Sequence, residues 1–146
     1  MDAVTADRGQ ALVIAVLALG IAAVTIVGLR AAQDRVLSDA HERRAGEAAV
    51  EAAGATLADA LVDLAASLRD RGNVRAVPTR VELESFIADP LIVERSRRSA
   101  NDLSAANGGG PVRDLVITVG ARTIDISLWA GAHRQGASIE TACCRR

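Results

Sequence analysis

Large aromatic side chains are almost absent from this sequence, which has no tyrosine, one phenylalanine and one tryptophan. Lysine is also absent, so the 17 basic residues are all arginines, and they nearly balance 18 acidic residues. The resulting net charge of −1 gives no overall basic field and argues against a nucleic-acid partner. Cys143 and Cys144 are adjacent, which excludes a long-loop disulfide within one chain and fits no zinc-ligand spacing.

Charged residues are missing from one long run, Ala11 to Leu29, which consists mainly of alanine, leucine, valine and isoleucine. As a helix this run is roughly 28 Å long, close to the hydrocarbon thickness of a bilayer. Its leucine, valine and isoleucine residues favour membrane insertion by roughly 3 to 7 kcal/mol. We therefore expect a transmembrane helix over residues 10–29, surrounded by membrane lipid. The alternative is a buried core helix, but a chain of 146 residues with so few large side chains has little with which to surround it.

Removal of the run as a secretory signal is a second alternative. The apolar core of a signal peptide is about 7 to 15 residues long, which is shorter than this run. The sequence from Arg30 onward also has no small-x-small cleavage site close behind the run. A retained anchor is therefore favoured.

Proline is absent before Pro78, and helix-forming residues continue to about Arg71. Apolar residues recur at alternating spacings of three and four between Val50 and Leu68, which predicts a narrow stripe for a partner helix or a covering sheet. Small residues on this segment either permit close backbone approach or reflect high helix propensity alone. They are Ala45, Gly46, Ala49, Ala53 and Gly54. Gly72-Asn73 predicts the end of the helix.

The middle of the sequence predicts two short helices. Thr79 followed by Glu82 resembles a capping box for a helix that runs to Ile87. Pro90 ends this helix, because the residue before a proline is pushed away from helical angles. A second amphipathic helix is expected from Leu91 to Leu103. Its arginines form either a solvated face or a patch for anionic lipid headgroups or an acidic neighbour.

After a glycine-rich segment at 107–111, which predicts a flexible loop, the periodicity becomes that of strands. Apolar and polar residues alternate in two segments within 114–128, joined at Gly120-Ala121, which predicts a hairpin with a two-residue type II′ turn. A third strand is expected from Ser138 to Cys143, after a loop from Gly131 to Gly136. An isolated hairpin is marginal in water, so its apolar face needs a cover.

These patterns predict an α+β fold, in which a long N-terminal helix spans the membrane with its first half and carries a small antiparallel sheet on its distal half. The expected segments are a leader over 1–9, the transmembrane helix over 10–29, a helical stalk over 30–72, and a small α+β head with a C-terminal hairpin over 73–146. The residues expected to pack the head on the stalk are Leu57, Leu61, Leu64, Leu68, Leu115, Ile117, Ile124 and Ile126.

Residue patterns for catalysis are weak. His41 lies in a charged helical stretch and His133 in a glycine-flanked loop, and neither has metal-ligand spacing or belongs to an HExxH motif. Asp59 and Asp63 are four residues apart on a helix, which favours a solvated face over an acid–base pair. Cys143-Cys144 either cross-links chains, acts in redox chemistry or is an ordinary terminal pair. We expect no catalytic residue, no metal and no cofactor.

The most informative motif is the junction Asp7 to Val13. A charged leader that ends at Gly9 is followed at once by the apolar helix, which resembles the processing site of type IV pilin-like proteins. The sequence RGQALV and the apolar run behind it are more closely similar to minor pilins of the tight-adherence (Tad, Flp-type) pilus, the TadE/TadG-like group. The alanine-rich segment from Arg43 to Ala53 is similar to the segment that follows the membrane helix in that group. The resemblance covers residues 7–60.

The resemblance implies that a prepilin peptidase cleaves between Gly9 and Gln10 on the cytoplasmic side. It also implies a single-pass protein of the cell membrane whose C-terminal part is extracytoplasmic. Such a protein joins other pilin subunits and the pilus assembly machinery, or a related secretion apparatus, at the cell surface. The small residues expected to permit helix contacts between subunits are Ala11, Ala15, Ala18 and Ala22.

Two features depart from the pilin pattern. Ile14 occupies the fifth position of the mature chain. Pilin-like subunits often carry a glutamate there, which pairs with a neighbour's amino terminus. A minor, tip or priming subunit therefore fits better than a repeating one. Arginines after the run, beginning with Arg30 and Arg35, outnumber Arg8 before it, and the positive-inside rule then favours a cytoplasmic C-terminal part.

Two alternatives to a pilin-like subunit remain open. One is an unprocessed single-pass accessory protein whose soluble part binds a partner. The other is a soluble or secreted binding module after signal removal.

Overall fold

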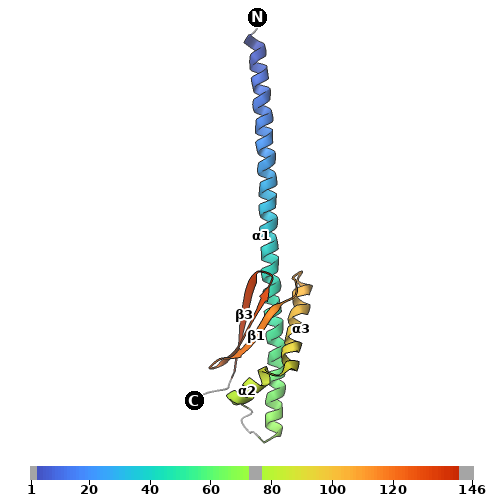
Figure 1. Ribbon diagram of the computed structural model, residues 1–146, viewed down its shortest axis with the longest axis vertical. Helices are drawn as coiled ribbons and strands as arrows, with labels where there is room; N and C mark the ends of the chain where they lie inside the picture. The colour runs from blue at the N-terminus through green and yellow to red at the C-terminus, as the bar shows by residue number, and fades with distance from the viewer. Residues whose placement is uncertain (1–2, 73–76, 142–146) are drawn as a thin grey trace. The chain divides into compact units, whose positions relative to one another are not determined.

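A computed structural model describes the backbone of residues 3–72 and 77–141, together with the side chains of Gln10 and of residues from 12 onward in these ranges. The chain divides into two compact units, residues 1–39 and 40–146. The elements are α1 (Ala3–Asp70), α2 (Arg80–Ile87), α3 (Pro90–Ala106), β1 (Arg113–Val119), β2 (Thr123–Ala130) and β3 (His133–Glu140) (Figure 1). The fold is α+β, as the sequence predicts.

Helix α1 begins at Ala3 and not at Gln10, the predicted start. Residues 3–8 contain no proline, and the isolated Gly9 costs only about 1 kcal/mol relative to alanine, which the helix on either side of it tolerates. The end of α1 is as predicted. Gly72 has a φ of +87°, and its N–H donates to the Arg69 carbonyl at 2.9 Å, which closes the last turn.

The predicted capping box at the start of α2 is present. The Thr79 backbone N–H donates to Glu82 Oε2 at 2.7 Å, and the Glu82 N–H donates to Thr79 Oγ1 at 3.3 Å. The bond from the Thr79 backbone, followed by the bond from the Thr79 hydroxyl, holds the pKa of Glu82 below its ordinary value, because both bonds favour the carboxylate.

We expect Glu82 to stabilise α2 at neutral pH and to lose this contribution in acid. Because its folded-state pKa is lowered, the contribution is fully present above the unfolded-state pKa and is lost as the pH falls through the folded-state pKa. Glu82→Gln should therefore flatten this part of the pH dependence, whereas Glu84→Gln on the same helix should preserve it. Thermal unfolding measured from neutral pH into the acid range tests this, and an equal acid loss in Glu82→Gln and wild type would contradict it.

Asp89-Pro90 ends α2 and also begins α3. Asp89 is the N-cap of α3, and its Oδ1 accepts a hydrogen bond from the Leu91 N–H at 2.8 Å. Pro90 occupies the first turn, where its missing N–H costs nothing. α3 is longer at both ends than the predicted 91–103, because Pro90 fits the first helical position and the helix continues to its C-cap at Asn107.

The loop at 107–111, predicted to be flexible, is tied to α3. The Gly109 N–H donates to the Ser104 carbonyl at 2.8 Å, and Ser104 Oγ donates to the Gly110 carbonyl at 2.8 Å. Asn101 Oδ1 accepts from the Val112 N–H at 2.8 Å. These bonds fix the direction in which the chain enters β1.

The strands form one antiparallel sheet in the order β1-β2-β3. The register pairs Ile117 with Ile126 and Val119 with Ile124, so the predicted alternation places these apolar residues on one face. A β-bulge interrupts the register between Arg113 and Val116, and Asp114 there has a φ of +49°. Aspartate adopts this left-handed backbone conformation more readily than most other residues do.

The predicted turn positions need correction. The Gly120 N–H donates to the Thr123 carbonyl at 2.7 Å, so the β1–β2 turn residues are Ala121 and Arg122, and Gly120 does not have the positive φ that a type II′ turn requires. The glycine suited to such a turn is Gly131, at φ +57°, which joins β2 to β3.

Strand β3 begins at His133, not at Ser138, so most of the loop predicted over residues 131–136 belongs to this strand. It was missed because an edge strand with one solvent-facing side needs no continuous apolar pattern. The last predicted residues of this strand, 142 and 143, lie outside the described residues.

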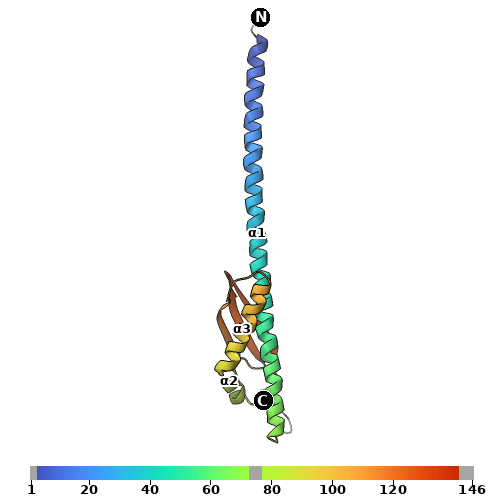
Figure 2. The same cartoon turned by 90° about the vertical axis from the view of Figure 1, so that its right-hand side faces the viewer.

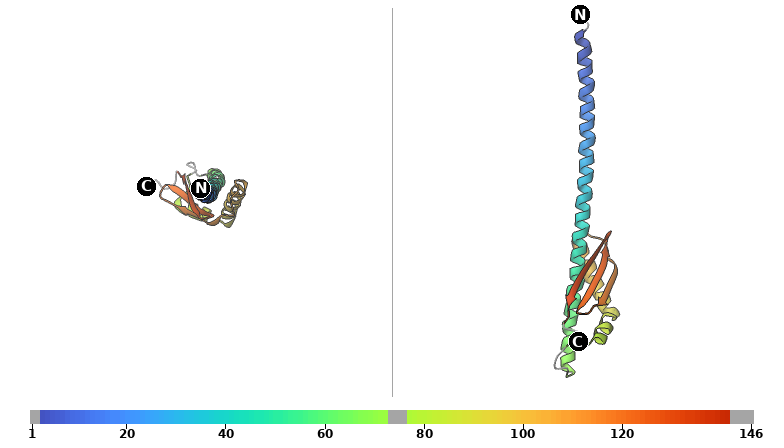
Figure 3. Two further views of the ribbon diagram at one scale, coloured as in Figure 1. Left: turned by 90° about the horizontal axis from the view of Figure 1, so that it is seen from above. Right: turned by 90° about the vertical axis from the view of Figure 1, so that its left-hand side faces the viewer.

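The apolar face of the sheet packs on the distal part of α1, and α3 lies beside the same part of the helix (Figures 2 and 3). The largest fully buried side chains come mainly from α1, α2 and β2, and include Leu57, Leu83, Ile124, Ile126 and Leu128. On α1 itself the buried face is built largely of alanine, with Ala45, Ala49 and Ala53 at 0% exposure. The small residues of this segment therefore serve close approach and not helix propensity alone.

Gly46 lies at a close approach of α1 to the sheet. A Cβ atom at this position would lie 2.9 Å from both Ala130 Cβ and Gln135 Cγ, closer than side chains tolerate. At Gly54, two turns further along, a Cβ would lie 3.7 Å from Ile126 Cδ1, which is an ordinary contact.

The same substitution at these two glycines should change the stability of the protein in opposite directions. We expect Gly46→Ala to destabilise the protein by about 1–3 kcal/mol through overpacking. Gly54→Ala should stabilise it by about 0.5–1 kcal/mol, because alanine is the better helix former. Denaturant unfolding of the full chain in detergent, followed by the fluorescence of the single tryptophan, measures both changes. Equal effects at the two positions would contradict the close approach at Gly46.

Candidate functional site

The predicted processing junction lies inside α1. Gly9 and Gln10 are both helical, and the Gln10 side chain is exposed. A protease groove generally takes substrate in an extended conformation, so residues around Gly9 would need to unwind for cleavage. Glycine is the residue at which a helix gives way most easily, because its backbone gains the most freedom on unwinding.

The apolar run of α1 is exposed along its described length. Its leucine, isoleucine and valine side chains from Leu12 to Leu29 have relative exposures between 57% and 76%. An 18-residue window here has a mean hydropathy of 2.8 and no buried residue. By length and composition this helix could cross a membrane. The alternative of a buried core helix does not fit these exposures.

The only hydroxyl in the run is satisfied within the helix. Thr25 Oγ1 donates to the Ile21 carbonyl at 2.8 Å. A hydroxyl that is bonded four residues back along its own helix costs little in an apolar medium, where an unsatisfied polar group costs several kcal/mol. The sequence shows the threonine, but only the structure shows its hydrogen bond.

The small residues expected to permit helix contacts have open surroundings. Ala15, Ala18 and Ala22 are exposed, whereas the side chain of Ala11 lies outside the described residues. Gly20 and Gly28 have no neighbouring atom within 4 Å of the place where a Cβ would stand. This surface is therefore accessible to a second helix.

The structure brings most of the predicted head–stalk residues into one cluster. Leu57, Leu115, Ile124 and Ile126 are buried members of the core. Leu61, Leu64 and Ile117 pack against it while half-buried. Leu68 is also buried, at 4% exposure, but outside this cluster.

Core residues outside the predicted packing set lie on α2 and α3, just before β1, and at the end of β2. They are Leu83, Ala100, Val112, Leu128 and Ala130. Leu128 belongs to the predicted alternation over 114–128 but not to the predicted packing set, whereas Ala100 has no signal beyond its position on α3.

The titratable side chains singled out in the sequence are the next candidates for a site. No three histidine, cysteine, aspartate or glutamate residues there are grouped so that they could hold a metal ion. His41, Asp59 and Asp63 are all exposed on α1. Cys143 and Cys144 fall outside the described residues.

Comparison with known proteins gives no relative: no family model, no curated protein and no solved structure matches this chain. The features available for a functional argument are therefore the exposed apolar run of α1, the junction at its start and the sheet packed on its distal part.

Proposed function

We propose that this chain is a pilin-like structural subunit, of the minor-pilin kind, which is anchored in the cell membrane by α1. Through this helix it assembles with other subunits into a pilus or a related secretion apparatus. The observation that carries the proposal is the exposed apolar run, because such side chains require lipid or the helices of other subunits around them. The three-stranded sheet packed on the distal part of α1 is consistent with a small head carried by that helix.

The proposal assigns the junction at Gly9-Gln10 to a prepilin peptidase on the cytoplasmic side. The residues after the run then lie outside the cytoplasm, where the head meets other subunits. Because Ile14 stands where an assembling pilin often carries glutamate, we assign a minor, tip or priming position and not a repeating one.

Incubation of membranes containing the full chain with a prepilin peptidase is expected to shorten the chain by nine residues and leave Gln10 as the amino terminus. Gly9→Leu should resist cleavage, because its side chain obstructs close entry of the backbone. Gly20→Leu is the matched control, since a Cβ added there would meet no described atom beyond its own stretch of helix within 4 Å, and it should be cleaved normally. An intact amino terminus after incubation with active peptidase would overturn the proposal.

An unprocessed single-pass accessory protein is the second candidate, and the arginine distribution favours it. Arg30 and Arg35 follow the run closely, whereas only Arg8 precedes it, which by the positive-inside rule places the C-terminal part in the cytoplasm. A reporter enzyme that is active only outside the cytoplasm, fused after residue 146, separates the two candidates. Activity supports the pilin-like orientation, and inactivity of a stably expressed fusion supports the accessory protein.

A further inference from the structure

The helix just beyond the apolar run, residues 30–39, has an amphipathic surface that no described side chain of its own unit covers. Val36 is 69% exposed and Leu37 is 57% exposed. With Ala32 and Gln33 they border a shallow groove along the helix. At about 100° per residue, Val36, Leu37, Ala32 and Gln33 share one side, whereas Ala31 and Ser38 lie on the opposite side.

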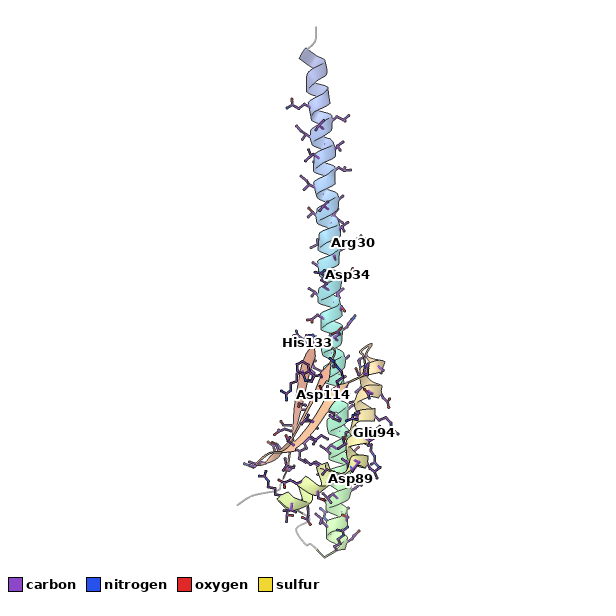
Figure 4. The ribbon with its side chains drawn as sticks, viewed as in Figure 1. Arg30, Asp34, Asp89, Glu94, Asp114 and His133 are labelled. Atoms are coloured by element: carbon purple, nitrogen blue, oxygen red, sulfur yellow. The ribbon has the colours of Figure 1, made fainter. Side chains whose placement is uncertain are left out.

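The apolar side of this segment continues the spacing of the run that precedes it. Positions alternate by three and four residues, as in the a and d positions of a coiled coil. They are Leu12, Ala15, Leu19, Ala22, Ile26, Leu29, Gln33 and Val36, which we call the seam. The seam extends from the apolar run into a segment that carries Arg30, Asp34 and Arg35, labelled in part in Figure 4. Val36 and Leu37 together form a small exposed apolar patch that a second helix can cover.

We propose that the seam pairs with the same seam of a second copy of this chain, as a parallel two-stranded coiled coil that extends beyond the membrane through Val36. Two copies anchored by the same run lie at the same depth in one membrane. Residues 29–36 of the two chains therefore meet at equal height and in register.

The residues along the seam suit a second copy. Gln33 occupies an a position, where its side-chain amide can bond to the same residue across the two-fold axis and thereby fix the register. Leu37, at the flanking e position, meets Ala32 at the g position of the second copy, which widens the apolar contact.

This inference rests on the membrane anchor of the proposed function and not on cleavage at Gly9. Pairing can therefore fail while the pilin-like proposal stands, and cleavage can fail while the pairing stands. The experiment is disulfide cross-linking in membranes that contain the full chain with Cys143→Ser and Cys144→Ser. Single cysteines are placed on the seam by Gln33→Cys and Val36→Cys. The matched controls, Ala31→Cys and Ser38→Cys, lie at f positions on the opposite side of the same turns.

Mild oxidation is expected to give a covalent dimer with the seam cysteines in several-fold higher yield than with the controls. Equal yields at all four positions would indicate random collision, and no dimer at any position would mean that the seams do not meet. Cross-linking of Val36→Cys to a different protein would assign the surface to that protein. Each of these three results would overturn the proposal.

A second measurement avoids introduced cysteines altogether. Untagged chain should be retained by a co-expressed tagged copy in mild detergent, and Val36→Glu with Leu37→Glu should reduce the retained fraction several-fold. Ala31→Glu with Ser38→Glu is the control and should leave it unchanged. Because all four side chains are exposed in the single chain, none of these changes disturbs the core. Equal retention of both double variants would contradict the seam.

Discussion

Leu57→Ala is expected to lower the free energy of unfolding of the 40–146 unit by about 2–5 kcal/mol, because it leaves a cavity where α1 meets the sheet. Leu57 is fully buried, and it belongs to the same core cluster as Ile124 and Ile126. The alanines around it on α1 have no spare side-chain volume with which to fill the space. A loss of this size is a large part of the stability of an ordinary small domain.

Denaturant unfolding of the full chain in detergent, followed by the fluorescence of Trp129 on β2, measures this loss. Leu61→Ala is the graded control, because Leu61 is half-buried at the border of the same cluster and should lose less. Val62→Ala should lose the least, since Val62 is 68% exposed. If the three substitutions had equal effects, the sheet would not pack on α1 as described.

Two arginines in the middle of the apolar run, Leu17→Arg with Ile21→Arg, are expected to abolish retention in the membrane. Each arginine at the centre of a transmembrane helix costs about 2.5–3.5 kcal/mol, so two offset most of the roughly 3 to 7 kcal/mol by which the run favours insertion. Both side chains are at least 60% exposed in the chain, so the substitutions act on the surroundings of the helix and not on its packing.

Fractionation of cells, followed by extraction of the membranes with alkaline carbonate, measures retention. The matched control is Ala31→Arg with Ser38→Arg, which adds the same charge to the same helix outside the run and should leave the protein in the membrane. A double variant in the run that still resists carbonate extraction would contradict a membrane location for residues 11–29.

Local signals in the sequence identified the elements that depend on neighbouring residues alone. The capping box of Thr79 and Glu82, the end of α1 at Gly72 and the alternation across Ile124 and Ile126 all follow from interactions within a few residues. The apolar run could likewise be recognised from its composition. These features made the α+β fold and the packing of the sheet on α1 predictable.

Features that depend on tertiary contacts could not be predicted in this way. Ser96 and Ser104 on α3 are fully buried although serine is a polar residue, and no local pattern in the sequence marks them as core positions. The sequence also did not show which of Gly120 and Gly131 forms a type II′ turn, because both are followed by alanine and either could form one. The register of the hairpins decides between them, and register is set by the whole sheet.

The alanine face of α1 affects how this interface can be mapped by mutagenesis. An alanine scan cannot test Ala45, Ala49, Ala53 and Ala60, because the wild-type residue at each of these positions is already alanine. The region would be recorded as tolerant although its fit is tight. A scan toward valine or leucine would reveal it, since each added methyl group must displace a neighbour.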